Sequence, residues 1–168
     1  QRPHLGFSEE HAAKVGIKGA KEFMRKLNKE IRELKGRTKK GLIEAAIILQ
    51  RNAEPATPVD LSNLRHSWFI VTDTSVESST PAFTGEDSGD MKGRHKEITG
   101  KAKGLAKELG SDAEPIVIFG YSVNYAPFVH EAIDVSFKRP GAKARWLYAA
   151  LQTSRAEMLE AIRKHARF

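Results

Sequence analysis

The hydrophobic positions of the first third of the chain repeat with helical spacing. The first four, at steps of four, four and three residues, are Phe23, Leu27, Ile31 and Leu34. Such spacing places them on one face of a helix. A broader apolar stripe resumes over residues 42–49 and stops before two prolines. We therefore expect one long helix over residues 20–53. The alternatives are a kink near Gly36 and Gly41 or two shorter helices, because glycine weakens a helix interior.

Two later segments are typical of strands. Residues 67–72 are aromatic and β-branched, and residues 116–121 form a continuous apolar run that predicts burial on both faces. Between them, residues 73–115 are rich in Ser, Thr, Gly and Lys and are expected to form a surface insertion. A short helix is expected inside it, over 98–109. Residues 78–97 hold too few large apolar groups to offset the entropy of ordering, so we expect them to be mobile or to order only in the assembly, against a neighbouring chain.

The last apolar stripe predicts a C-terminal helix from residue 142 to about residue 166. The order helix, strand, strand, helix favours an α+β fold. We expect a small antiparallel sheet packed against the long N-terminal helix and the C-terminal helix, with the long insertion between the strands. Residues 1–168 are expected to form a single domain, with 1–14 as an N-terminal arm.

The charge of the chain is concentrated near its beginning. The net charge is +7, and residues 1–51 hold 13 Lys and Arg against 6 Asp and Glu, so the remainder is neutral. This distribution suits an anionic partner such as DNA or an acidic protein face, and an ordinary solvated helix face is the alternative. The residues predicted to face a DNA channel or an acidic partner are Lys21, Arg25, Lys29, Arg32, Lys35, Arg37, Lys39 and Lys40.

Motifs that would indicate catalysis are missing from the sequence. The chain has no Cys, which excludes disulfides, thiol catalysis and Cys-ligated metals. His130 and Glu131 begin like a zinc-protease signature, but Asp134 stands where the second His would be. We expect no enzyme activity and no catalytic, cofactor or metal site. Neither a membrane span nor a secretion signal is expected, because no apolar stretch is long enough.

Two segments of the sequence carry a more specific signal. The first combines Pro58-Val59-Asp60 with Leu64-Arg65 and Ser67 in a helix stop, a turn and a strand start. Leu64 offers an apolar plug beneath the turn, and Asp60 or Ser62 can cap local N–H groups. The second segment combines Tyr125-Ala126 with Val129 and His130-Glu131, directly after the stronger strand.

Together these segments resemble the HK97 gp10-like family of tailed-phage tail completion or neck proteins. That family typically shows a basic N-terminal helix ending in P-V-D-T-G-x-L-R-x-S, then a strand, a variable loop, a strand, Y-A-x-x-V-(H)-E and a C-terminal helix. The resemblance covers residues 15–168, and residues 139–151 resemble the approach to the last helix. Leu61-Ser62 replaces the usual Thr-Gly, and Ala132 stands where Gly usually follows the Glu.

The resemblance implies a structural role in the head-to-tail connection of a tailed-phage virion. The chain would assemble in the host cytoplasm as a homo-oligomeric ring, expected to be a hexamer, around the DNA channel. Its partners would be other phage neck and tail proteins, with non-specific contact to DNA. The alternative is a basic nucleic-acid-binding protein acting through the N-terminal helix, and a third class is a small hydrolase or toxin. The residues predicted to lie at subunit or ring interfaces are Arg65, Trp68, Tyr125, Phe128, His130 and Glu131.

Overall fold

A computed structural model describes residues 20–59, 62–78, 82–111 and 114–167. Within them the chain is α+β, as the sequence predicts. Besides two 3-10 turns, Glu54–Ala56 and Arg65–Ser67, the helices and strands in chain order are α2 (Ala20–Ala53), β1 (Trp68–Val71), β2 (Val76–Ser78), α3 (Ser88–Leu109), β3 (Ile118–Tyr121), α4 (Ala126–His130) and α5 (Trp146–Ala166). The predicted arm at 1–14 lies outside the described residues.

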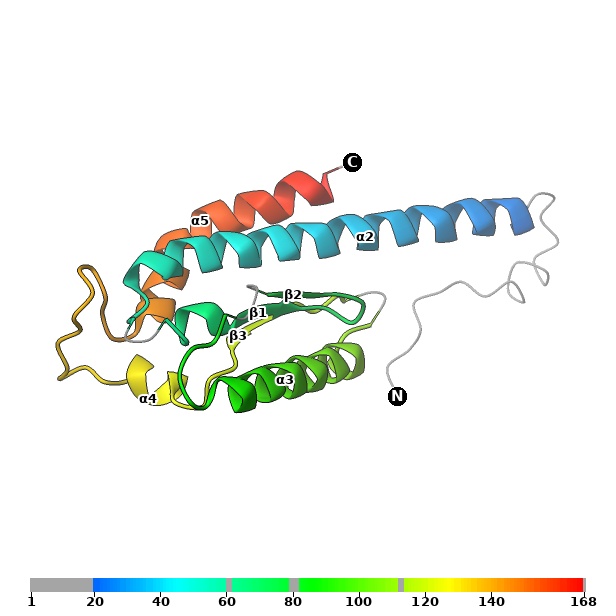
Figure 1. Ribbon diagram of the computed structural model, residues 1–168. Helices are drawn as coiled ribbons and strands as arrows, with labels where there is room; N and C mark the ends of the chain where they lie inside the picture. Colours follow the sequence, from blue (N-terminus) through cyan, green and yellow to red (C-terminus); the bar gives the residue numbers. More distant parts are fainter. Residues whose placement is uncertain (1–19, 60–61, 79–81, 112–113, 168) are drawn as a thin grey trace.

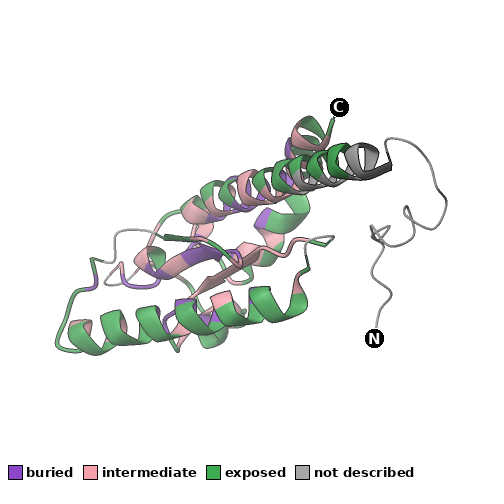
Figure 2. Cartoon of the chain, turned by 90° about the vertical axis from the view of Figure 1, so that its right-hand side faces the viewer, coloured by how far each residue is buried: buried purple, intermediate pink, exposed green. Residues whose placement is uncertain are grey.

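A small antiparallel sheet separates two helical layers. Its strand order is β2-β1-β3, with Phe69 paired to Gly120 on one side and to Ser78 on the other. Helix α2 crosses one face with α5 lying against it, and α3 covers the opposite face (Figure 1). The central strand β1 is therefore the most buried, and Figure 2 shows buried residues on it and on the side of α3 that faces it.

Helix α2 is one unbroken helix, so neither the kink nor the two-helix alternative applies. Its C-terminal part packs antiparallel to α5, with Asn52 Nδ2 donating to Ser154 Oγ at 2.8 Å and Arg51 Nη2 lying 2.5 Å from Glu157 Oε1. Gly41 lies against the backbone of α5. A Cβ atom at Gly41 would lie 2.9 Å from Ile162 Cα, closer than side chains tolerate. Because glycine has no Cβ, it allows the two helices to pack closely at this point. The packing compensates for the low helix propensity of glycine.

The segment 73–115 contributes more to the fold than a surface insertion. It supplies β2 and the long α3, which begins at Ser88 rather than near residue 98. Buried side chains of the segment include Phe83, His95 and Ala106, which pack within this chain. The expectation that residues 78–97 order only against a neighbouring chain is therefore wrong for residues 82–97; residues 79–81 lie outside the described part.

The other differences from the sequence prediction lie at element ends and edges. Strand β3 is only half-buried because it is an edge strand, so the predicted burial on both faces is wrong. The short elements β2 and α4 were not predicted. Helix α5 begins at Trp146 rather than at residue 142, because Arg145 adopts a left-handed conformation with φ of 52° that no helix continues through.

Candidate functional site

The C-terminal end of α2 holds together the segments that the sequence singled out. The Glu54 carboxylate forms ion pairs with Arg65, from the first segment, and with Arg139, from the approach to α5. Arg139 Nη1 also donates to the carbonyl oxygens of Glu54 at 2.9 Å and Thr57 at 3.2 Å. The backbone N–H of Lys143 donates to the Ala56 carbonyl at 3.1 Å. Glu54 therefore joins segments that lie up to 85 residues apart in sequence.

The second segment is anchored to the start of α5. The backbone N–H of Arg145 donates to the His130 carbonyl at 2.7 Å, and Arg145 Nε donates to Glu131 Oε2 at 3.2 Å. His130 Nδ1 lies 2.8 Å from Glu131 Oε1. The hydrogen bond from His130, with help from Arg145, holds the pKa of the Glu131 carboxyl below its usual value. Glu131 is thus ionised at neutral pH and links α4 to α5.

Aromatic rings fill the space beneath these polar links. Trp146 is fully buried, with the His130 ring 4.7 Å away and the Tyr121 ring 5.9 Å away, both in edge-to-face geometry. Burial raises the pKa of the Tyr121 hydroxyl. The ring cluster connects β3, α4 and α5 into one rigid end of the molecule.

The turn of the first segment has a conformation that the sequence did not reveal. Ser62 has φ of 64°, in the left-handed region that favours glycine. This is the position at which the resembling family usually has Gly. The next residue, Asn63, is buried, and its side-chain amide donates to the Thr84 carbonyl at 2.9 Å while accepting from the Thr84 N–H at 2.8 Å. Leu64 is buried beneath the turn, as predicted.

A groove of about 510 Å³ runs between the two segments, and we call it the motif groove. Its deep residues, Asn63 and Leu64, come from the first segment. Tyr125, which precedes α4, and Val129, on α4, form another wall. The other residues that line it are Pro58, Val59, Met91, Ser136, Phe137 and Lys138. The sequence pattern could not reveal this groove because the loop after α4 completes it.

The predicted interface residues fall into three classes. Arg65 and Glu131 are exposed but have partners within the chain, namely Glu54 and Arg145. Trp68, Tyr125 and His130 are half-buried: Trp68 pairs with Tyr121 in the sheet, and the other two pack against the core and Trp146. Phe128 differs from all of them because 78% of its surface is exposed.

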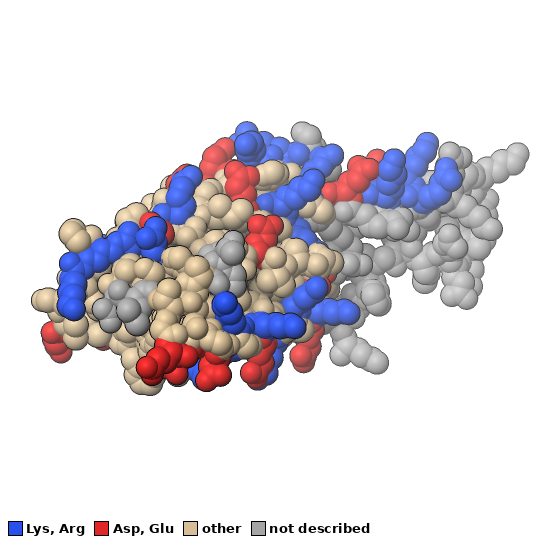
Figure 3. All heavy atoms as spheres, in the orientation of Figure 1, with Lys and Arg blue, Asp and Glu red and all other residues tan. Residues whose placement is uncertain are grey.

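The predicted basic residues are mostly exposed on α2. Arg25, Lys29, Arg37 and Lys40 are exposed, and Lys29 Nζ lies 3.9 Å from Glu33. The side chains of Lys21, Arg32 and Lys35 lie outside the described part, although their backbone belongs to α2. Figure 3 shows Lys and Arg along α2 interleaved with acidic residues.

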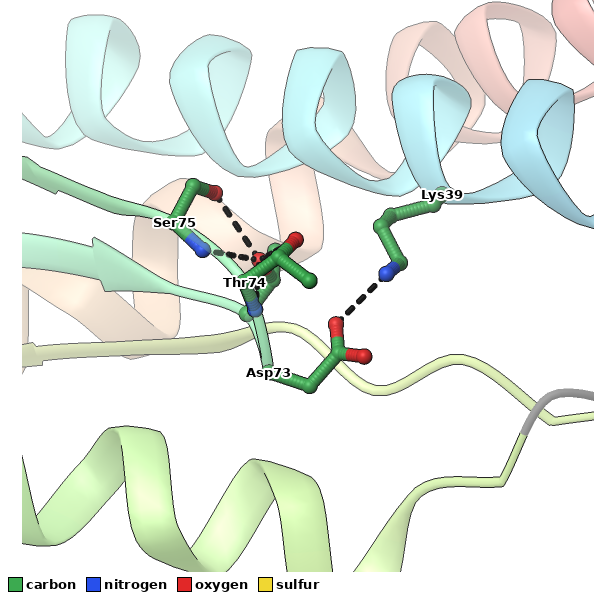
Figure 4. Close-up of polar contacts among 5 residues, drawn as sticks. Lys39, Asp73, Thr74 and Ser75 are labelled. Carbon is green, nitrogen blue, oxygen red and sulfur yellow. Dashed lines mark hydrogen bonds and ion pairs between the residues drawn. The ribbon is translucent and has the colours of Figure 1, made fainter.

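Lys39 is the exception among the predicted basic residues. Its Nζ lies 2.5 Å from Asp73 Oδ1, at the β1–β2 turn (Figure 4). The Thr72 hydroxyl accepts hydrogen bonds from the N–H groups of Thr74, at 3.2 Å, and Ser75, at 2.9 Å, and thereby shapes the turn. The bond from Lys39 lowers the pKa of the Asp73 carboxyl. Lys39 therefore fastens the sheet to α2 instead of facing a partner, which corrects that prediction.

One further buried polar pair joins α3 to the residue after β3. His95 Nδ1 lies 2.7 Å from Ser122 Oγ, but both residues are buried, and burial lowers the pKa of the His95 imidazole. No group of three or more His, Asp or Glu residues could hold a metal ion in this part of the chain. Across the same residues, the helices lack the length and apolar character that crossing a membrane requires.

Comparisons of the chain with protein-family models, with curated proteins and with solved structures found no match.

Proposed function

We propose that this chain is a structural component of a tailed-phage virion, a tail completion or neck protein of the head-to-tail connection. It acts as a ring of identical subunits around the DNA channel and contacts other neck or tail proteins. Its role is shape and contact rather than chemistry. The proposal starts from the sequence resemblance, and features of the structure support it.

The conformation of Ser62 is the observation that carries this proposal. A non-glycine residue in the left-handed region costs roughly 1–2 kcal/mol, so a chain adopts it where the surrounding structure demands that turn. Ser62, which has this left-handed conformation, stands at the position matched to the glycine of the family motif. The turn therefore keeps a glycine-type backbone although its sequence departs from the pattern.

The convergence of the matched segments gives further support. Residues from 58–67, 125–131 and 139–151 meet around Glu54, Arg145 and Trp146. Segments matched in order along a sequence need not touch in space. Their contact here indicates that the matched positions form one structural unit, as a shared fold would require.

The deciding experiment is to locate the chain in virions. An antibody against the chain, or an affinity tag fused to it, is expected to label one end of the tail where it joins the head. Mass spectrometry of purified particles is expected to find several copies per particle. Single copies, or no copies in the particle, would contradict the proposal.

The exposed basic side chains of α2 favour a second candidate, a free nucleic-acid-binding protein. Arg25, Lys29, Arg37 and Lys40 would then contact phosphates, and binding would weaken steeply with salt. Sequence-dependent binding by a monomer at nanomolar concentration and physiological salt would favour this candidate. Weak binding without sequence preference fits the ring, in which many subunits share the contact with DNA.

A further inference from the structure

Three exposed apolar side chains lie on α4 and in the loop after it, next in sequence to residues that line the motif groove. Phe128 on α4 is 78% exposed, and Ile133 and Val135 in the following loop are 64% and 56% exposed. We call these three residues the apolar knob. Val129 of α4 and Tyr125 just before it line the groove, but Phe128 does not. The knob therefore leaves the groove of its own chain open.

The groove has the size and chemistry to receive such a knob. Its volume of about 510 Å³ lies within the range of sites that enclose a ligand of several rings. Leu64, Met91 and Phe137 present apolar surface, and the buried Asn63 amide is already satisfied by the Thr84 backbone. An aromatic or branched aliphatic side chain therefore suits it better than a polar ligand.

The charges beside the two surfaces are complementary. Asp134 lies between Ile133 and Val135 of the knob, and Lys138 lines the groove. Both side chains are exposed, and neither forms an ion pair within the described residues. Within the described residues, one chain thus offers a group of exposed apolar side chains with an unpaired carboxylate and an apolar recess with an unpaired ammonium group.

We propose that the apolar knob of one copy inserts into the motif groove of a second copy, with Asp134 of the first facing Lys138 of the second. The contact joins two different surfaces of the chain, and in the proposed ring it runs head to tail, so that each copy gives its knob to one neighbour and its groove to the other. Repeating such a contact closes a ring when the rotation between copies allows it. The inference rests on the proposed ring and names the surfaces that build it.

A charge exchange tests this contact in solution. Lys138→Glu and Asp134→Lys each set like charges against one another, so each is expected to raise the apparent dissociation constant of self-association about tenfold or more. The double variant restores an opposite pair and is expected to associate within about threefold of the parent chain. The measurement is sedimentation velocity at low salt, over protein concentrations up to about 1 mM.

Matched variants on another surface control for net charge. Lys107→Glu and Glu108→Lys, near the C-terminal end of α3, make the same changes of charge at residues that are also exposed and do not line the groove, and are expected to leave self-association unchanged. A parent chain that stays monomeric over the whole range would overturn the proposal. Single variants that behave like their α3 controls, or a double variant without recovery, would do the same.

A photo-crosslink then locates the contact. A benzoylphenylalanine introduced at Phe128 should react with residues 58–64 or 136–138. In a mixture of ¹⁵N-labelled and unlabelled chains, crosslinked peptides that combine the two labels are expected. Products that join only peptides of one label would show reaction within a chain and overturn the proposal.

Truncation of the knob gives a measurement independent of charge. Phe128→Ala is expected to abolish self-association without changing the circular dichroism spectrum, because the side chain packs little within its own chain. Leu109→Ala, which removes a 59% exposed side chain at the end of α3, is the control and is expected to associate normally. Normal association of Phe128→Ala would contradict the contact.

These outcomes separate the inference from the proposed function. Crosslinking between copies would support the contact even if the chain were missing from virions, which would contradict only the phage role. A ring found in virions with the groove of each copy empty would contradict only the contact.

Discussion

The backbone conformation of Ser62 is imposed by the structure around it. Its left-handed backbone is followed by the buried pair Asn63 and Leu64, and the His66 N–H donates to the Ser62 carbonyl at 3.0 Å. The serine therefore retains a conformation that its Cβ disfavours, because the side chains of the two residues after it are held in place. The sequence identified a turn here but gave no sign of its handedness.

We predict that Ser62→Gly stabilises the chain by about 1 kcal/mol, since glycine removes the steric cost of a positive φ. Ser62→Ala is the matched comparison and is expected to give no gain, because alanine keeps the Cβ. Urea unfolding monitored by circular dichroism measures both. If glycine and alanine had equal effects, the left-handed turn would be contradicted.

Asp73 makes the attachment of the sheet to α2 sensitive to acid. Its pKa is lowered in the folded chain, mainly by the hydrogen bond from Lys39. The stabilisation is therefore fully present above the unfolded pKa of about 3.9 and is lost as the pH falls through the lower folded value. We predict that Asp73→Asn is less stable than the parent chain at pH 7 and that the difference shrinks below about pH 4.

Urea unfolding of both chains between pH 7 and pH 2.5 tests this pH dependence. Glu86→Gln alters an exposed carboxylate before α3 and is the control, expected to show a small difference with no such trend. A difference between Asp73→Asn and the parent that stayed constant over the whole range would rule out a role for ionised Asp73.

Helix α2 illustrates how a local propensity is overridden by tertiary contact. The prediction from the sequence allowed a break at Gly36 or Gly41, but the apolar stripe on both sides continues through them as one helix. The two glycines have different surroundings. No heavy atom lies within 4 Å of a Cβ at Gly36, whereas a Cβ at Gly41 meets the α5 backbone.

We predict opposite effects for the same substitution at these two positions. Gly36→Ala is expected to stabilise the chain by up to about 1 kcal/mol through helix propensity. Gly41→Ala is expected to destabilise it by roughly 1–3 kcal/mol, because α5 must shift. Thermal and urea unfolding measure both, and a stabilising Gly41→Ala would show that the helices do not approach as closely as described.

The elements that the sequence failed to predict have weak local signals. The first half of α3 holds Gly89 and Gly93 and few apolar residues, and it is helical because His95 and Thr99 are buried against the sheet. Strand β2 is exposed along its whole length, so no alternation marked it. The strands β1 and β3 and the long helix α2 were predictable because their apolar residues have a clear period or a continuous run.

The candidate site was predictable only in part, for a similar reason. The motif segments could be located along the chain, but Glu54, which pairs with Arg65 of the first segment and with Arg139, lies at the end of α2 and belongs to neither segment. Arg145 pairs with Glu131 in the site, and its backbone is left-handed, which no feature of the sequence predicts. Residues that pair with side chains distant in sequence show no regular spacing by which the sequence could identify them.

At the scale of the whole molecule, the chain has a folded body and a projecting helical half. The described contacts between α2 and α5 begin near Arg37, whose Nη1 lies 3.5 Å from the Arg167 carbonyl, and residues 20–36 extend beyond the end of α5 (Figure 1). An isolated helix of that length is marginal in water, so the body is expected to fold without it.

We therefore predict that a chain beginning at residue 37 keeps the unfolding free energy of the parent within about 1 kcal/mol. A chain beginning at residue 46 also loses the contact between Gly41 and Ile162 and the ion pair between Glu44 and His165, and is expected to be markedly less stable. Urea unfolding compares the two. Equal stability losses would show that residues 20–36 are part of the cooperative body.

The projecting half of α2 also has a mechanical consequence. The helix is held along its C-terminal part, where Gly41 packs against the backbone of α5. A small rotation of α2 relative to α5 would have this contact as its fulcrum. At 1.5 Å per residue, the lever from Gly41 to Ala20 is about 30 Å long. A rocking of about 5° at the fulcrum therefore swings the tip through roughly 3 Å. Sub-ångström adjustments where α2 meets α5 reach the far end of the lever as displacements comparable to the width of an atom.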